Sequence, residues 1–169
     1  SSLLQASGRK VGRYTSPHLH TMRERMSVNG EPVSEAQFVE SYEDVAPYLA
    51  LVDEHSRRND NPRMSFFEVL TVTALAAFAD IPVDAAVVEV GMGGEWDATN
   101  VLDADVAVLT PIAHDHEKWL GSSLTDIAKE KVGIIKPDSF VISAKQEPEV
   151  MEIIRSKAAE VGAVLRVVG

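Results

Sequence analysis

Short apolar segments alternate with longer segments of helical periodicity along the whole chain. Segments of four to seven residues rich in β-branched side chains are typical of strands, and longer periodic segments are typical of helices. The pattern predicts strands at 10–15, 84–90, 105–110, 140–143 and 164–168. It predicts helices at 1–7, 34–57, 65–79, 124–135 and 148–161. This alternation predicts an α/β fold, with a mostly parallel sheet flanked by helices.

Capping and turn signals set the ends of several of these elements. Ser34 with Gln37, and Ser65 with Glu68, have the spacing of a capping box, which closes the first turn of a helix. The dipeptide at 29–30, Asn-Gly, lies between two short segments and predicts a tight turn or hairpin. The two helices that begin after Ser34 and Ser65 are therefore predicted from local chemistry as well as from periodicity.

The segment 84–90 carries the most informative pattern. It is apolar at nearly every position, which predicts a strand buried on both faces of a parallel sheet. Glu89, near its end, is costly to bury without a positive partner, and ligands bind at the carboxyl ends of such strands, so a metal ion is a candidate partner. The glycines at 91, 93 and 94 then permit turns that a Cβ would hinder. The alternative is a solvated glutamate followed by an ordinary turn.

Two further polar clusters follow predicted strands. Ser16, Pro17 and His18 come after the first strand and offer a hydroxyl and an imidazole to a metal or a substrate; the alternative is a plain proline turn. The segment 114–117, His-Asp-His-Glu, follows the strand at 105–110, which is also predicted to be buried; the alternative is a solvated surface cluster. Because the carboxyl ends of parallel strands share one edge, all three clusters are predicted to meet there.

Two helices carry side chains with more than one possible use. Phe66 and Phe67 begin the helix at 65–79 and could stack on a flat ring, although core packing is the commoner use of such aromatics. The helix at 124–135 carries Lys129 and Lys131, which would ordinarily form a solvated face.

Composition excludes several classes of function. With 16 Lys and Arg against 26 Asp and Glu, the net charge is −10, which argues against non-specific binding to nucleic acid. The chain has no cysteine, so disulfides and zinc–thiolate sites are excluded. No apolar run is long enough to cross a membrane, and no signal peptide is seen. We expect a cytoplasmic protein without nucleic-acid or membrane partners.

Several motifs occur together in a fixed order. They are the segments 14–19 (Tyr-Thr-Ser-Pro-His-Leu), 67–68 (Phe-Glu), 89–94 (Glu-Val-Gly-Met-Gly-Gly), 97–100 (Asp-Ala-Thr-Asn), 110–112 (Thr-Pro-Ile), 115–116 (Asp-His), 119–121 (Trp-Leu-Gly) and 130–134 (Glu-Lys-Val-Gly-Ile). In these motifs the chain resembles the ATP-binding domain of the folylpolyglutamate synthase/dihydrofolate synthase family, within the Mur-ligase superfamily. The resemblance spans nearly the whole chain, and it implies a single domain of the P-loop/Mur-ligase central type over 1–169.

The resemblance implies an ATP-dependent ligase that adds L-glutamate to dihydropteroate or a folate through an acyl phosphate. Its implied cofactors are ATP and Mg²⁺, and relatives are commonly monomers. Ser16, Glu89 and His116 match positions that hold metal. Lys131 matches a lysine that the family carbamylates, and Lys131 and His116 are the implied catalytic residues. The implied substrate-binding residues are Ser16, Pro17, His18, Phe67, Glu68, Asp97 and Asn100.

The chain also departs from the family pattern. The family's glycine-rich phosphate loop and its smaller C-terminal domain have no counterpart in 1–169, which predicts a domain truncated at both ends and inactive by itself. Glu95 stands where many relatives carry arginine, which puts a phosphate or folate contact at this position in doubt. Two alternatives stay open: another Mur-type amino-acid ligase, and a non-catalytic module that binds nucleotide or folate.

Overall fold

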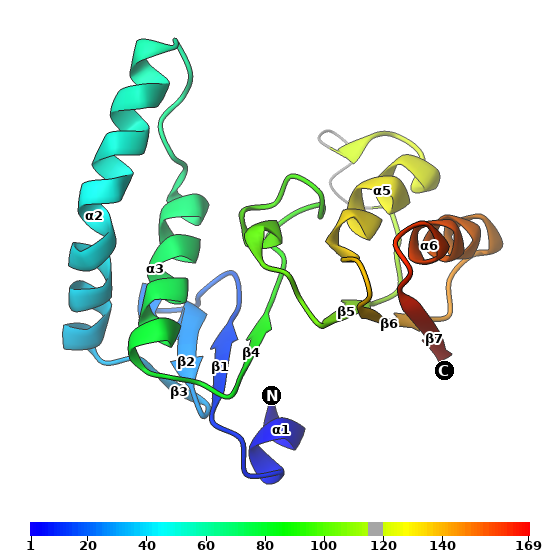
Figure 1. Ribbon diagram of the computed structural model, residues 1–169, viewed down its shortest axis with the longest axis horizontal. Coiled ribbons are helices and arrows are strands. Elements are labelled where there is room, and N and C mark those ends of the chain that lie inside the picture. The colour runs from blue at the N-terminus through cyan, green and yellow to red at the C-terminus, as the bar shows by residue number, and fades with distance from the viewer. Residues whose placement is uncertain (115–119) are drawn as a thin grey trace. The chain divides into compact units, whose positions relative to one another are not determined.

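The computed structural model describes residues 1–114 and 120–169, which divide into two compact units, Ser1–Gly91 and Met92–Gly169. Each unit contains its own sheet and its own hydrophobic core. Among the described residues, the structure contains no helix long and apolar enough to cross a membrane. Figure 1 shows both units with their elements labelled.

The first unit is a mixed sheet with two long helices. Its elements are α1 (Ser2–Ala6), β1 (Val11–Tyr14), the short 3-10 helix η1 (Met22–Arg25), β2 (Met26–Val28), β3 (Glu31–Pro32), α2 (Glu35–Arg58), α3 (Phe66–Asp80) and β4 (Ala85–Val88). The strand order is β3-β2-β1-β4. β1 pairs in parallel with β4 and antiparallel with β2, so the unit combines one crossover connection with a hairpin.

The hairpin turn between β2 and β3 follows from its two residues. Asn29 has φ 51° and Gly30 has φ 88°. Two successive residues in this left-handed region are what a tight hairpin turn requires, and Asn and Gly are the residues that adopt it most readily. The turn predicted at 29–30 is confirmed.

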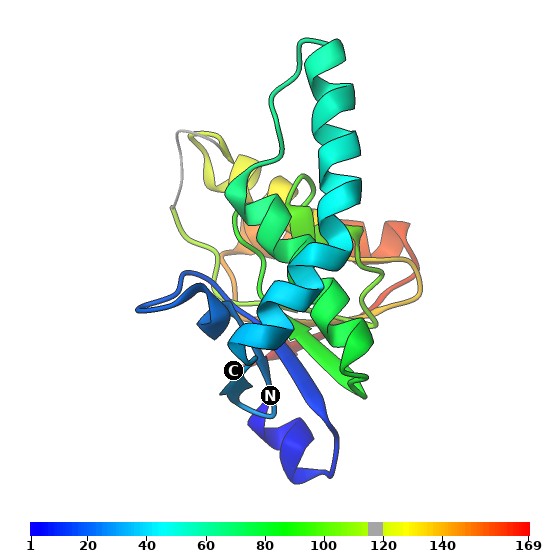
Figure 2. The same ribbon diagram turned by 90° about the vertical axis from the view of Figure 1, so that its left-hand side faces the viewer.

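The core of the first unit lies where α3 and its neighbours pack on the sheet. Tyr14 and Met26 from the strands are almost fully buried against Leu70, Ala74 and Phe78 of α3. Helices α2 and α3 lie side by side, as Figures 1 and 2 show from two directions. Because α3 is apolar on nearly all sides, it can contact both the sheet and α2.

The second unit is an all-parallel sheet with helical crossovers. Its elements are the short 3-10 helix η2 (Ala98–Val101), β5 (Val106–Leu109), α5 (Leu124–Lys131), the short 3-10 helix η3 (Val132–Ile134), β6 (Phe140–Ala144), α6 (Pro148–Glu160) and β7 (Val164–Val168). The strand order is β5-β6-β7, and both pairings are parallel. Ile127 of α5 and Ile154 of α6 are fully buried against Val141 of the central strand.

The predicted α/β class and the helices and strands above are confirmed, and one detail of the prediction is wrong. The antiparallel pairings of the first sheet both involve β2, the first strand of the hairpin predicted at 29–30, and the other pairings are parallel. β4 and β5 are not buried on both faces: Val87 is 36% exposed and Val108 is 61% exposed. β4 is an end strand of the first unit's sheet and β5 is an end strand of the second unit's sheet, so within its own unit each has a hydrogen-bonded neighbour on one side. The single domain over 1–169 stays a prediction.

Ser65→Ala is expected to destabilise the protein by about 1 kcal/mol, the usual cost of losing an N-cap. The Ser65 hydroxyl accepts from Glu68 N–H at 3.2 Å, and the Glu68 carboxylate accepts from Ser65 N–H at 2.6 Å. Denaturant unfolding measures the change, and Ser56→Ala, in the last turn of α2, is the control. Equal free energies of unfolding for the two variants would contradict this role of the cap.

Candidate functional site

Two of the predicted clusters meet at the carboxyl ends of the parallel pair β1 and β4. Tyr14 is the last residue of β1 and pairs with Val88, the last residue of β4. Directly beyond them, Ser16 N–H donates to the Glu89 carboxylate at 2.9 Å. The other carboxylate oxygen has no bond to Ser16, and Glu89 is exposed. The structure therefore confirms that Ser16 and Glu89 come together at this edge, and their role in binding a ligand stays a prediction.

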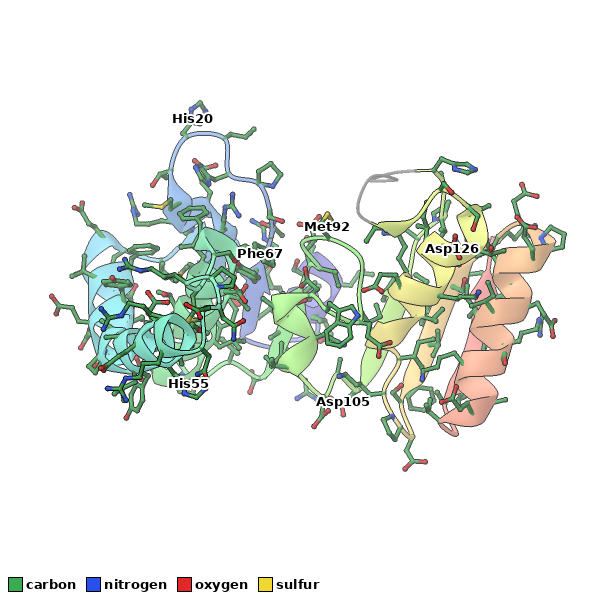
Figure 3. All side chains as sticks on the ribbon, turned by 90° about the horizontal axis from the view of Figure 1, so that it is seen from above. His20, His55, Phe67, Met92, Asp105 and Asp126 are labelled. Carbon is green, nitrogen blue, oxygen red and sulfur yellow. The ribbon has the colours of Figure 1, made fainter. Side chains whose placement is uncertain are left out.

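The loop 16–21, between β1 and η1, is held in place by Glu24. The Glu24 carboxylate accepts from the backbone N–H groups of Leu19 at 2.9 Å, His20 at 3.1 Å and Thr21 at 2.9 Å. The loop begins with a cis peptide bond between Ser16 and Pro17. Figure 3 shows His20 at the outer end of this loop, pointing away from the ribbon. A single carboxylate thus fixes three successive peptide groups of a loop that carries predicted site residues.

Arg25 connects the loop to the start of α3. Its Nε donates to His18 Nδ1 at 2.9 Å, and its guanidinium carbon lies 5.5 Å from the centre of the Phe66 ring. The side chain is 9% exposed, and its backbone carbonyl accepts from Thr15 N–H at 2.8 Å. A guanidinium over an aromatic face gains a cation–π attraction that strengthens as water is excluded. Arg25 therefore joins two segments, 16–19 and 66–68, that are far apart in the sequence.

The predicted substrate residues on α3 have structural contacts of their own. The Phe67 ring lies 5.9 Å from that of Tyr14 and belongs to the core of the first unit, which is the alternative that the sequence left open. Glu68 uses its carboxylate in the capping box with Ser65. Phe66, whose ring meets the Arg25 guanidinium, is 54% exposed and is the more accessible aromatic of the pair.

In the second unit, Asp97 and Asn100 shape the glycine loop. The Asp97 carboxylate accepts from the N–H groups of Met92 and Thr99, both at 2.9 Å. Asn100 donates its side-chain amide to the carbonyls of Glu95 at 3.0 Å and Gly133 at 3.2 Å. Figure 3 labels Met92, the residue of this loop that Asp97 holds. These contacts establish a loop-shaping role, and the substrate-binding role of both residues stays a prediction.

The glycine loop packs directly on the end of α5, where Lys131 lies. Glu95 N–H donates to the Glu130 carbonyl at 3.0 Å. A Cβ added at Gly94 would lie 2.5 Å from the Glu130 carbonyl oxygen and 3.0 Å from Lys131 Cα. Lys131 is the last residue of α5 and is half-buried. The close packing of the glycine loop on the end of α5 therefore fixes the position of the Lys131 Cα atom.

The predicted metal set is only partly described. Ser16 and Glu89 lie together, and His116 lies outside the described residues. Within 1–114 and 120–169, no group of three or more His, Asp or Glu side chains is arranged to hold a metal ion. A hollow of about 280 Å³ in the second unit is lined by Glu95, Lys129 and Lys157 among others, and none of the predicted site residues lines it.

Three residues that contribute to the site were missed by sequence reasoning: Glu24, Arg25 and Glu130. For Glu24 a signal was present, because Thr21 and Glu24 have the same capping spacing as Ser65 and Glu68. Nothing in the local sequence indicates that Arg25 reaches both His18 and Phe66, since that contact depends on the fold.

Glu24→Gln is expected to lower stability at neutral pH and to lose this effect in acid. Hydrogen bonds from Leu19 N–H, then Thr21 and His20 N–H, hold the pKa of the Glu24 carboxyl below its usual value. A carboxyl whose pKa is lowered by folding stabilises the fold fully above its ordinary pKa and loses that contribution as the pH falls through the lowered value. Urea unfolding of both proteins at several pH values measures the difference. A difference that does not change with pH would contradict the prediction.

Parallel strands with polar loops gathered at their carboxyl ends define a class of α/β proteins that bind ligands at that edge. No family model matches the chain. The chain is 48% identical to the dihydrofolate synthase/folylpolyglutamate synthase of Mycobacterium tuberculosis over 96% of its own length and 35% of the relative. It is 40% identical to the protein of the same name from Escherichia coli, over 98% of the chain and 36% of the relative.

Solved structures agree with these sequence relatives. The Mycobacterium tuberculosis folylpolyglutamate synthase complexed with ADP and AMPPCP matches with a TM-score of 0.92 at 49% identity, over 98% of this chain and 38% of that one. A folylpolyglutamate synthase–AMPPCP–folate complex matches with a TM-score of 0.86 at 37% identity, over 98% and 40%. The chain is therefore homologous to one segment of the folylpolyglutamate and dihydrofolate synthases, and it spans about a third of the length of the curated relatives it matches.

Proposed function

We propose that this chain is part of an ATP-dependent ligase that joins L-glutamate to dihydropteroate or a folate. The observation that carries the proposal is the similarity to enzymes of that name over 96% of the chain. The names of the solved relatives include ADP, AMPPCP and folate, which supports ATP and a folate as ligands of the whole protein. The adjacency of Ser16 and Glu89 at the ligand-binding edge is consistent with this assignment.

The proposed reaction has two steps. An oxygen of the substrate carboxylate attacks the γ-phosphorus of ATP, the bond to the β-phosphate oxygen breaks, and an acyl phosphate and ADP form. The amino group of L-glutamate then attacks the acyl carbon and loses a proton, and phosphate leaves with the carboxylate oxygen. Negative charge builds on the phosphoryl oxygens, so positioning and fixed positive charge carry most of the rate acceleration.

The residues present fit a magnesium ion. Mg²⁺ takes hard oxygen ligands and is commonly bound through one or two carboxylates together with substrate phosphates. The Ser16 backbone N–H contacts the Glu89 carboxylate, and we infer that the Ser16 hydroxyl and this carboxylate hold one ion and that His116 helps to hold a second. When bound, Mg²⁺ would neutralise charge on the phosphate oxygens.

Lys131 is proposed to carry a carbamate. The Lys131 ammonium would first lose a proton, and the neutral amine would then attack CO₂, forming an N–C bond and releasing a second proton. A cation would thereby become an anion able to lie near the second metal ion, the one that His116 is inferred to hold. Lys131 is half-buried at the end of α5, so neighbouring atoms limit the positions that a carbamate on its side chain could take. A carbamate there would supply an acidic oxygen ligand for that ion.

We propose that Ser16, Pro17 and His18 contact the pterin from the loop 16–21. Phe67 and Glu68 are proposed to contact the pterin from α3. Asp97 and Asn100, which hold the glycine loop in shape, are proposed to contribute to the same substrate site. A cytoplasmic monomer without nucleic-acid or membrane partners stays a prediction.

Phosphate release by the full-length protein that contains this chain tests the function. Mg-ATP and L-glutamate are supplied with and without dihydropteroate, and tetrahydrofolate replaces dihydropteroate in a second series. Release that requires one of the two pterin substrates supports the proposal. Release with neither, but with a peptidoglycan precursor acid, would assign another Mur-type ligase, and no release with any acid would leave a non-catalytic binding module.

A further inference from the structure

The loop 16–21 has more internal support than an exposed loop needs. A capping box for η1 requires only the Thr21 N–H bond to Glu24, yet Leu19 and His20 also donate to the same carboxylate. Bonds to an ionised carboxylate are stronger than bonds between neutral groups. Three of them on successive residues restrict the conformation of this stretch of backbone. Glu24 thus determines the shape of the loop, beyond ending a helix.

Arg25 determines the state of the imidazole in this loop. An arginine Nε is always a donor, so His18 Nδ1 must accept in the 2.9 Å bond and carries no proton in this arrangement. The ring N–H is therefore at Nε2. The guanidinium has a second contact, because its carbon lies 5.5 Å from the centre of the Phe66 ring, and this cation–π contact restrains the Arg25 side chain. The imidazole consequently has one defined donor.

We propose that Glu24 and Arg25 are positioning residues for substrate recognition: Glu24 fixes the backbone of the loop, and Arg25 fixes His18 so that its Nε2–H donates to an acceptor on the substrate ring. The acceptor would be a carbonyl oxygen or an unprotonated ring nitrogen, which a pterin carries. The substrate part of this inference rests on the proposed function. The support of the loop by Glu24 and Arg25 does not, because it follows from the contacts alone.

Backbone amide exchange tests the role of Glu24 without requiring activity. In Glu24→Gln the amides of Leu19, His20 and Thr21 are expected to exchange about tenfold faster or more, since each loses a charged acceptor. Glu31→Gln, an exposed carboxylate on β3 in the same unit, is the control and should leave these amides unchanged. If Glu24→Gln fails to fold, Glu24→Asp keeps the charge but is too short to reach all three donors. Unchanged exchange in the variant that folds would overturn the proposal.

Kinetics of the full-length protein test the consequence for substrate binding. Glu24→Gln and Arg25→Lys are expected to raise KM for the pterin substrate about tenfold and to leave KM for ATP unchanged. Faster exchange with an unchanged pterin KM would show that the two residues support only the fold, and would overturn the positioning role. A wild-type protein inactive with every pterin acid would refute the proposed function, and the exchange experiment would still decide whether Glu24 holds the loop.

Discussion

Gly94→Ala is expected to destabilise the protein by about 3 kcal/mol, the upper part of the usual range for overpacking. The added Cβ would lie 2.5 Å from the Glu130 carbonyl oxygen, 2.9 Å from the Lys131 carbonyl oxygen and 3.0 Å from Lys131 Cα. All three are backbone atoms, so no side chain can rotate away, and the glycine loop must separate from the end of α5. Denaturant unfolding measures the loss.

Gly8→Ala provides the control for this variant. Gly8 has φ 84°, and an added Cβ there would have no atom within 4 Å. Its cost should therefore be only that of a left-handed backbone, about 1 kcal/mol. Gly133→Ala tests the same contact from the other side, because its Cβ would lie 2.6 Å from Glu95 Cα. A Gly94→Ala protein as stable as the wild type would contradict the close packing of the loop on α5.

Glu89→Gln is expected to lower kcat/KM of the full-length enzyme by about 100-fold or more, with little change in stability. An amide keeps the shape of the side chain and can still accept from Ser16 N–H, but it loses the negative charge that a magnesium ion requires. The loss should be smaller at high Mg²⁺ concentration if the variant mainly weakens metal binding. Steady-state kinetics over a range of Mg²⁺ concentrations measure both effects.

Asp84→Asn is a matched control on the same strand. Asp84 precedes β4 and accepts from Lys10 N–H at 2.7 Å, just as Glu89 follows β4 and accepts from Ser16 N–H. The two carboxylates thus make similar backbone contacts at opposite ends of the parallel pair. Asp84→Asn should retain activity, because only the carboxyl end of the pair is the ligand-binding edge. Equal losses in both variants would assign Glu89 a structural role and remove it from the metal site.

Features set by local chemistry, or by the rule that the carboxyl ends of parallel strands share one edge, could be predicted from the sequence. The capping boxes at Ser34 and Ser65, the turn at Asn29 and the meeting of Ser16 with Glu89 all follow from local chemistry or from the rule for parallel strands. The burial of β4 and β5 could not be predicted, because an apolar segment does not indicate whether its strand is central or at the edge.

The connections between distant segments were also beyond the sequence. Arg25 lies 41 positions before Phe66, and only the packing of α3 on the sheet brings the guanidinium over that ring. Glu68 illustrates a different difficulty. The family motif predicts that Glu68 contacts substrate, and its spacing from Ser65 predicts that it caps a helix. The structure shows the helix cap. A carboxylate can serve either role, so the identity of the residue alone does not show which role Glu68 has.

The fate of the carboxylate oxygen tests the proposed ligase most directly. Dihydropteroate labelled with ¹⁸O in its carboxyl group is given to the full-length protein with Mg-ATP and L-glutamate, and the released phosphate is examined by mass spectrometry. Activation through an acyl phosphate predicts that one labelled oxygen passes to phosphate for each amide formed. Amide formation with unlabelled phosphate would contradict the proposed chemistry, and phosphate release without amide formation would contradict the assignment as a ligase.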